Sequence, residues 1–386
     1  MKKLLFSLSI LGALFTSCST DDDEGTIQPV EGELTGTITT NRTVAFGNYT
    51  ISGIVTIESG VTVTFEAGST ITANAANGVD ALVVKKGGRL IMNGTATQPI
   101  VLTEQTKIPG SWGGIIMYGD APIRGAGDTT TKTSEDGLNL PYGGDNAAHN
   151  GGTLRYVRVE YAGKKITDGT SEMNGFSFYS VGTGTTLDHL VSYKGADDGF
   201  EFYGGTVNAT NLISYGNFDD SFDWQDGWRG QSNSNWLAIQ VGTGNFGMEI
   251  EASNNNNNYW PVISGITLKR MAGTQTEGGS SAAEHDAIQF KKDGNGEFSN
   301  VVISGYTTTG ATAVRIQDAN TNVNQVDGSK IKLTNIKIND GTSEFSGAGS
   351  IAVTFPAGQF VTNSVATGAS LTTGAWATVD GVSLIQ

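Results

Sequence analysis

The chain has 386 residues, including 54 glycines, 7 prolines and a single cysteine, and its formal net charge is −15. One cysteine excludes a disulfide scaffold, and the excess of acidic residues argues against a nucleic-acid partner, which would need a basic surface. A hydrophobic share of 37% is too high for a chain that is disordered throughout. The composition therefore indicates a folded, acidic protein that is rich in glycine.

The first 17 residues have the layout of a secretory signal peptide. Lys2 and Lys3 precede an apolar stretch at residues 4–15, which is too short to cross a bilayer as a mature helix. Residues 14–18, Leu-Phe-Thr-Ser-Cys, resemble the processing site of bacterial lipoproteins. This resemblance implies that Cys18 is lipidated and becomes the first residue of the mature chain. The membrane is therefore an expected partner, through the lipid anchor.

An acidic and polar segment follows Cys18. Residues 21–24 are Asp-Asp-Asp-Glu, a run that resembles the surface-export signal of Bacteroidota lipoproteins. A solvated tether explains the same residues, and we predict a flexible tether over residues 18–40. The predicted location is the outer membrane, with the lipid-anchored protein facing the cell exterior.

The body of the chain repeats itself. Residues 195–202 (Gly-Ala-Asp-Asp-Gly-Phe-Glu-Phe) match residues 217–224 (Asn-Phe-Asp-Asp-Ser-Phe-Asp-Trp) at an offset of 22. Similar short strands recur with offsets of 24, 22, 26, 40 and 26, and they begin at Phe176, Phe200, Phe222, Met248, Ile288 and Val314. Short strands between turn residues, with a period near 24 residues, indicate a solenoid rather than a sandwich or a barrel.

We therefore predict an all-β fold, a right-handed parallel β-helix of about ten coils, as a single domain over residues 41–386. Coils stack about 4.8 Å apart, so inward side chains form one core and outward side chains form ladders of like residues. Asn211, Asn300 and Asn335 each precede an equivalent strand, which predicts an asparagine ladder at a turn. Loops are expected near residues 119–152, 252–260 and 271–284.

Four segments resemble a known family. Residues 111–114 (Ser-Trp-Gly-Gly), 154–163, 196–205 and 219–230, with their two Asp-Asp pairs, are similar to right-handed parallel β-helix surface lipoproteins of Bacteroidota. The similarity covers about residues 45–340. It implies the fold and the cell surface, and it brings no established activity.

The acidic corner at residues 195–226 is the predicted site, because it contains seven acids and no Lys or Arg. The 22-residue offset stacks the acids of one coil on those of the next, and stacked carboxylates repel by about 1 kcal/mol even at water-like screening. A hard cation with oxygen ligands would offset this repulsion, and Ca²⁺ is the expected cofactor. The predicted metal ligands are Asp197, Asp198, Glu201, Asp219, Asp220 and Asp223.

Capping is the alternative explanation of these acids, because aspartates at tight corners accept hydrogen bonds from backbone N–H groups in Asx-turns. Trp228 lies in a turn just after the corner, and we expect its ring to be exposed for a ligand. Lys194 and Arg229 flank the corner in the sequence. The predicted ligand-binding residues are Trp228, Arg229 and Lys194.

Two enzyme classes share the predicted fold. Pectate-lyase-like β-helices pair Ca²⁺-binding aspartates with a Lys or Arg base, for which Lys194 and Arg229 are the candidates. Polygalacturonase-like β-helices use aspartates with a histidine motif that this chain lacks. A stack of many acids does not single out the carboxylate pair that glycoside hydrolysis needs, so we assign no catalytic residue.

The expected function is a non-catalytic binding or adhesion module that is anchored in the outer membrane and exposed at the surface. Its partner would be a glycan or another outer-membrane protein. The alternative is a Ca²⁺-dependent polysaccharide lyase or a glycoside hydrolase that uses the corner at residues 194–229.

Overall fold

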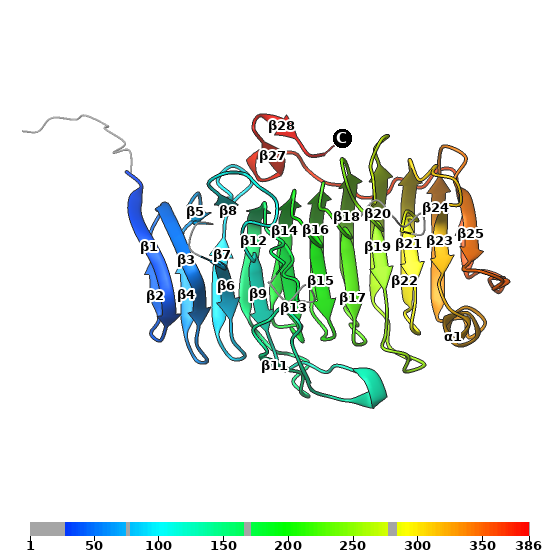
Figure 1. The fold of residues 1–386 in the computed structure, drawn as a ribbon, viewed down its shortest axis with the longest axis horizontal. Helices are drawn as coiled ribbons and strands as arrows, with labels where there is room; N and C mark the ends of the chain where they lie inside the picture. Colours follow the sequence, from blue (N-terminus) through cyan, green and yellow to red (C-terminus); the bar gives the residue numbers. More distant parts are fainter. Residues whose placement is uncertain (1–27, 75–77, 166–170, 277–283, 386) are drawn as a thin grey trace, which may run out of the picture.

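The computed structural model describes residues 28–74, 78–165, 171–276 and 284–385. The predicted signal peptide, Cys18 and the acidic run at residues 21–24 lie outside these ranges. The described chain is a parallel β-helix, with 24 strands in one sheet and coils stacked along the long axis of the molecule (Figure 1). No helix in the described ranges is long and apolar enough to cross a membrane.

The coils begin with two long strands, β1 (Val30–Ile38) and β3 (Gly47–Ile57), which pair in parallel. Further strands continue the second half of β3 in a column that we call the acidic-face column. They are β6 (Ala81–Val84), β9 (Ile115–Tyr118), β13 (Phe176–Tyr179), β15 (Phe200–Tyr203), β17 (Phe222–Gln225), β19 (Met248–Ile250), β21 (Ile288–Phe290), β23 (Thr312–Ile316) and β25 (Ser343–Gly347). With β3, this column has ten members among the described residues, which agrees with the prediction of about ten coils.

Two other columns complete each coil. In the first coils they are separate short strands, namely β2 (Arg42–Val44), β4 (Thr62–Phe65), β5 (Thr70–Ala73), β7 (Arg89–Asn93) and β8 (Ile100–Glu104). Later coils use one long bent strand for both columns. These strands are β12 (Gly152–Glu160), β14 (Thr186–Tyr193), β16 (Asn208–Tyr215), β18 (Asn233–Gln240), β20 (Val262–Arg270), β22 (Gly296–Ser304) and β24 (Ile331–Ile338), followed by the short β26 (Phe360–Thr362).

The register confirms the predicted repeat. Phe200 pairs with Phe176 and with Phe222, at offsets of 24 and 22 residues, as the sequence alignment requires. The later offsets of 26, 40 and 26 residues are confirmed in the same column. The sequence alone therefore predicted which side chains lie above one another.

The bend of each long strand is a residue in the left-handed region. His189, Asn211, Asn300 and Asn335 have φ values between 55° and 57°, and each falls in a gap of the pairing register. Asparagine tolerates this conformation because its short polar side chain forms local hydrogen bonds. The Asn235 amide, at the same place, donates to Asn211 Oδ1 at 3.1 Å, so the predicted asparagine ladder is confirmed.

Stacked aromatic rings form the centre of the core. The ring centroids of Phe176 and Phe200 lie 5.0 Å apart, and those of Phe200 and Phe222 lie 5.7 Å apart. Trp228 also belongs to the core, because its side chain is fully buried and its ring stacks on Phe202 at 4.4 Å. The expectation that Trp228 is exposed is therefore wrong, and its indole N–H instead donates to the Val207 carbonyl at 3.1 Å.

Both ends of the helix differ from the predicted boundaries. β1 lies within residues 18–40, which were predicted as a tether. The strand was not predicted because Leu34 alone of its nine residues is buried, so the sequence has no alternating hydrophobic pattern there. After β26 the chain forms no further coil and runs back across the earlier ones (Figure 1). This return segment, residues 363–385, is held by backbone N–H groups that donate to ladder asparagines, such as Gly368 to Asn300 Oδ1 at 3.2 Å. It contains η5 (Ala375–Ala377), β27 (Thr378–Val379) and β28 (Val382–Ser383).

A long excursion between β9 and β12 packs against the acidic-face column. It contains η2 (Ala126–Asp128), β10 (Lys132–Thr133) and β11 (Pro141–Tyr142). Lys132 forms an ion pair at 2.9 Å with the buried Asp226, and the Tyr142 hydroxyl donates to the same carboxylate at 2.6 Å. Asp226 therefore fastens this excursion. A smaller helical turn, α1 (Ala319–Thr321) with η4 (Asn322–Val326), follows β23.

The positive φ of the bend residues predicts how substitutions at Asn211 change the stability of the protein. Asn211→Val should lower the free energy of unfolding by about 1–2 kcal/mol more than Asn211→Gly, because a β-branched residue is strained at positive φ and glycine is not. Urea unfolding of both variants measures the difference, and both lose the same amide hydrogen bonds. Equal stability of the two variants would contradict this account of the bend.

Candidate functional site

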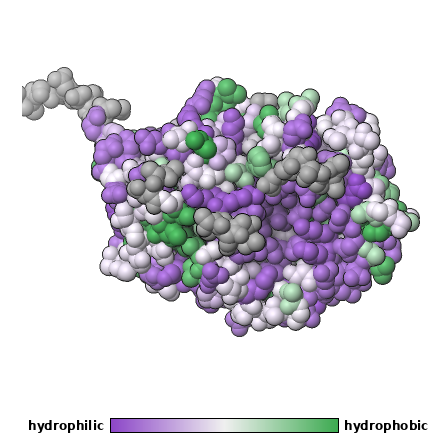
Figure 2. Space-filling view, in the orientation of Figure 1, coloured by the Kyte–Doolittle hydropathy of each residue, from purple (hydrophilic) through white to green (hydrophobic). Residues whose placement is uncertain are grey.

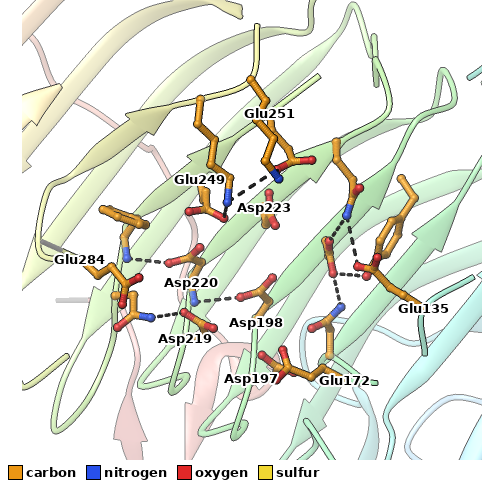
Figure 3. Close-up of a pocket in the computed structure, with 18 residues that line it drawn as sticks. Glu135, Glu172, Asp197, Asp198, Asp219, Asp220, Asp223, Glu249, Glu251 and Glu284 are labelled. Carbon is orange, nitrogen blue, oxygen red and sulfur yellow. Dashed lines mark hydrogen bonds and ion pairs between the residues drawn. The ribbon is translucent and has the colours of Figure 1, made fainter. Parts of the chain in front are cut away.

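A cavity of about 420 Å³ opens on the acidic-face column. Figure 2 shows a hydrophilic hollow on the face in view, and Figure 3 shows the cavity itself. Eleven of its lining residues are acidic, namely Glu135, Glu172, Asp197, Asp198, Glu201, Asp219, Asp220, Asp223, Glu249, Glu251 and Glu284. Lys291 and Lys292 are its only lysines or arginines among the described residues. We call this cavity the acidic pocket, and it contains all six predicted metal ligands.

One row of carboxylates comes from the strands. Glu201 on β15 pairs in register with Asp223 on β17, which pairs with Glu249 on β19. Their neighbours Phe200 and Phe222 point into the core, so the alternation of a strand turns these acids outward. The stacking of Glu201 on Asp223 is as predicted, and Glu249 extends the row by one coil.

A second row comes from the turns that precede these strands. Asp198 Oδ1 accepts a hydrogen bond from the Asp220 backbone N–H at 2.9 Å, and Asp220 Oδ1 accepts one from the Phe246 N–H at 2.6 Å. Each aspartate thus caps the turn of the next coil, as the capping explanation predicts. In the same row, the Asn245 side-chain amide donates to Asp219 Oδ1.

Capping does not use every buried oxygen. Among the described residues, Asp197 Oδ2 and Asp223 Oδ1 have no hydrogen-bond partner, although their residues are only 2% and 9% exposed. A buried, unpartnered carboxylate oxygen costs free energy that something in the working protein should offset. The two oxygens lie within the acidic pocket (Figure 3).

The spacing of the carboxylates suits a metal ion. Four groups of three acids each place one oxygen per residue within 4.8 Å of the others. The groups are Glu172–Asp197–Asp219, Asp198–Asp219–Asp220, Asp198–Glu201–Asp223 and Asp220–Asp223–Glu249. Because the groups share members, the pocket is a continuous field of oxygen donors. Such donors suit hard cations such as Ca²⁺ and Mg²⁺ rather than soft metals, which prefer sulfur.

Burial and mutual repulsion favour the protonated carboxyls. Burial raises the pKa of Glu201 to about 8, and the Glu135 carboxylate adds to this shift. Burial also raises the pKa of Asp198 and of Asp223 well above the ordinary value, with further contributions from the Asp220 and Glu201 carboxylates respectively. Either protons or a cation must therefore neutralise part of the pocket.

The structure adds two lysines that the sequence analysis did not assign to the site. Lys291 lies just after β21 and pairs with Glu249, and Lys292 pairs with Glu251 at 2.6 Å. Burial disfavours the Lys291 ammonium, but the Glu249 and Asp223 carboxylates outweigh burial and raise its pKa. The 40-residue offset from Met248 to Ile288 predicts that β21 lies beside β19. This register could therefore have placed Lys291, which follows β21, near the acids of β19.

The predicted ligand-binding residues lie elsewhere. Lys194 is exposed and its ammonium lies 5.2 Å from the Tyr193 ring centroid, beside the return segment. Arg229 lies against Tyr259 in another groove, with its guanidinium 3.7 Å from the ring centroid. Neither residue lines the acidic pocket, because Lys194 lies beside the return segment and Arg229 lies in the groove with Tyr259. Trp228, as described above, is in the core.

The raised pKa values predict how stability depends on pH. Between the ordinary pKa of a glutamate, 4.5, and about 8, the folded state holds more protons at Glu201 than the unfolded chain does. The free energy of unfolding should therefore fall as pH rises through this interval. Melting temperatures in chelator from pH 5 to 9 test this, and Glu201→Gln should flatten the profile while Asp145→Asn, at an exposed position, should not. A melting temperature that rises over the interval would contradict the assignment.

Comparison with known proteins places the chain in a family. Residues 36–379 match the family described as a pectate-lyase-like β-helix domain. The comparisons with curated proteins and with solved structures gave no match. The match covers most of the chain, and it agrees with the stacked parallel strands. The chain therefore belongs to the family of pectate-lyase-like β-helix domains.

Proposed function

We propose that this protein is a surface lipoprotein of the Bacteroidota type whose acidic pocket binds Ca²⁺ and whose body acts as a non-catalytic binding module. The observation that carries the metal proposal is the pair of buried, unpartnered oxygens, Asp197 Oδ2 and Asp223 Oδ1. They lie in a pocket where eleven acids face two lysines, an excess of nine formal negative charges.

Ca²⁺ fits the pocket for reasons of chemistry and rigidity. It takes six to eight oxygen ligands in flexible geometry, and the pocket offers carboxylate oxygens from several coils. Asp198 and Asp220 are held by the backbone N–H groups that they cap, so the ligand positions exist before the ion arrives. The ion would also relieve the repulsion that raises the pKa values of these acids.

Anchoring rests on the sequence. Residues 1–17 are proposed as the signal peptide, Cys18 as the lipidated residue and residues 21–24 as the signal for export to the outer face of the outer membrane. In this arrangement the elongated body stands at the cell surface, where a glycan or an outer-membrane protein is the proposed partner.

A glycoside hydrolase is the second candidate, and Glu201 is the observation that favours it. A carboxyl with a pKa near 8 is protonated at neutral pH and could act as a general acid. Bound Ca²⁺ would favour the ionised form and remove this acid. A lyase is less well supported, because its base must be neutral and the raised pKa of Lys291 keeps the ammonium charged.

Calcium should stabilise the protein through the acidic pocket. At a hundredfold excess over Kd, one bound ion adds about 2.7 kcal/mol to the free energy of unfolding, so the melting temperature should rise. Asp197→Asn combined with Asp223→Asn should abolish the rise, and Asp145→Asn should retain it. If Ca²⁺ gives the same melting temperature as chelator in the unchanged protein, the metal proposal is wrong.

Catalysis is tested on acidic polysaccharides. We expect neither new reducing ends nor unsaturated products, with Ca²⁺ or with chelator. Reducing ends that disappear in Glu201→Gln would overturn the non-catalytic proposal in favour of a hydrolase. Unsaturated products that disappear in Lys291→Met would overturn it in favour of a lyase.

A further inference from the structure

A second cavity, of about 430 Å³, lies at the opposite end of the same short strands. Its lining comes from the turns after β13, β15 and β17, from residues 258–260, from Asn208 at the start of β16 and from Ala147 of the long excursion. Thr183, Thr206, Gln231 and Trp260 therefore belong to successive coils. Three coil spacings of about 4.8 Å give a groove roughly 14 Å long, which is too long for a single sugar ring and suits a short linear chain.

Hydrogen bonds hold the backbone of the aromatic residues Tyr259 and Trp260 in this groove. The Tyr259 backbone N–H donates to Asn257 Oδ1 at 3.1 Å, and Asn257 is itself buried. The Gln231 side-chain amide donates to the carbonyls of Trp260 at 2.7 Å and Arg229 at 3.0 Å. Tyr259 nevertheless keeps 46% of its surface exposed. A rigid, exposed aromatic surface loses little conformational entropy when a ligand packs on it.

Arg229 provides the charge of the groove. Its guanidinium packs on the Tyr259 ring, and its Nε donates to the Gly227 carbonyl at 3.0 Å. Within the described ranges Arg229 forms no ion pair, whereas the nearby Arg124 pairs with Asp128 at 2.5 Å. Burial lowers the pKa of the Arg229 guanidinium. A partly buried cation without a carboxylate partner is the feature that an anionic ligand group would complete.

We propose that this groove binds an acidic oligosaccharide, with sugar rings packed on Tyr259 and Trp260 and a carboxylate or sulfate bonded to Arg229. The inference rests on the proposed binding function and names its ligand class. The planar guanidinium matches the two oxygens of such a group. Thr206, Asn208 and Gln231 line the rest of the groove. The Thr206 hydroxyl and the Gln231 amide donate within the protein, so their oxygens are left to accept hydrogen bonds from sugar hydroxyls. A groove of this size holds a chain of a few rings and is smaller than a stable protein interface requires.

Calorimetry with oligogalacturonate and with a sulfated heparin fragment, both in chelator, tests this proposal. We expect at least one of the two to bind. Arg229→Gln should weaken that binding at least tenfold, Trp260→Ala should weaken it to a similar extent, and Asp223→Asn in the acidic pocket should leave it unchanged. For oligogalacturonate, the methyl-esterified form should bind at least tenfold more weakly, because it lacks the charge.

Three results would overturn the proposal. The first is that neither acidic ligand binds. The second is that Arg229→Gln and Trp260→Ala both bind as tightly as the unchanged protein. The third is that polyglutamate binds more tightly than both sugars. Melting temperatures of the variants separate a lost contact from a lost fold, and Trp260→Ala supplies a second measurement if Arg229→Gln is unstable. The Ca²⁺-dependent melting shift is read on the same proteins, so failure at this groove and failure at the acidic pocket remain distinguishable.

Discussion

The stacking of coils in register is the constraint on which the rest of the structure depends. Each residue lies about 4.8 Å from its counterpart in the next coil, whatever its chemistry. Where the repeated residue is aromatic, as at Phe176, Phe200 and Phe222, the register gives a stacked core. Where it is acidic, as at Glu201 and Asp223, the same register brings like charges together. The fold thus imposes the repulsion that the acidic pocket must offset.

The two explanations of the aspartates are complementary, because different aspartates of the same pocket cap turns and face the cavity without a partner. Asp198 and Asp220 each use Oδ1 to cap the next coil. Asp197 Oδ2 and Asp223 Oδ1 face the pocket without a partner in the part of the chain that the structure describes. The capping bonds hold the turns in place, and rigid turns fix where the remaining oxygens lie. A pocket built this way departs from complete pairing of buried polar groups, and such departures are expected at functional sites.

Features that follow from the repeat could be predicted from the sequence, and features outside the repeat could not. Offsets between matching strands gave the register, the stacking of Glu201 on Asp223 and the asparagine bends. β1 was missed because one buried leucine makes no pattern, and the return segment was missed because it follows no repeat. Trp228 was placed outside because turns are usually exposed. Its indole N–H has a buried carbonyl partner, which lets the ring enter the core without an unpaired donor.

Charge within the acidic pocket is compensated unevenly, and the proposed cation would bind where the lysines do not neutralise the carboxylates. Lys291 and Lys292 neutralise the side formed by Glu249 and Glu251, through contacts that the structure resolves. On the opposite side Lys165 pairs with Glu172 at 2.9 Å. The carboxylates between these lysines include the two unpartnered oxygens, and burial raises the pKa values of Asp197, Asp198 and Asp223 well above the ordinary value. Protons occupy Glu201 up to a pKa of about 8, whereas a bound cation would leave the carboxylates ionised, so protons and a cation would compete for the same oxygens.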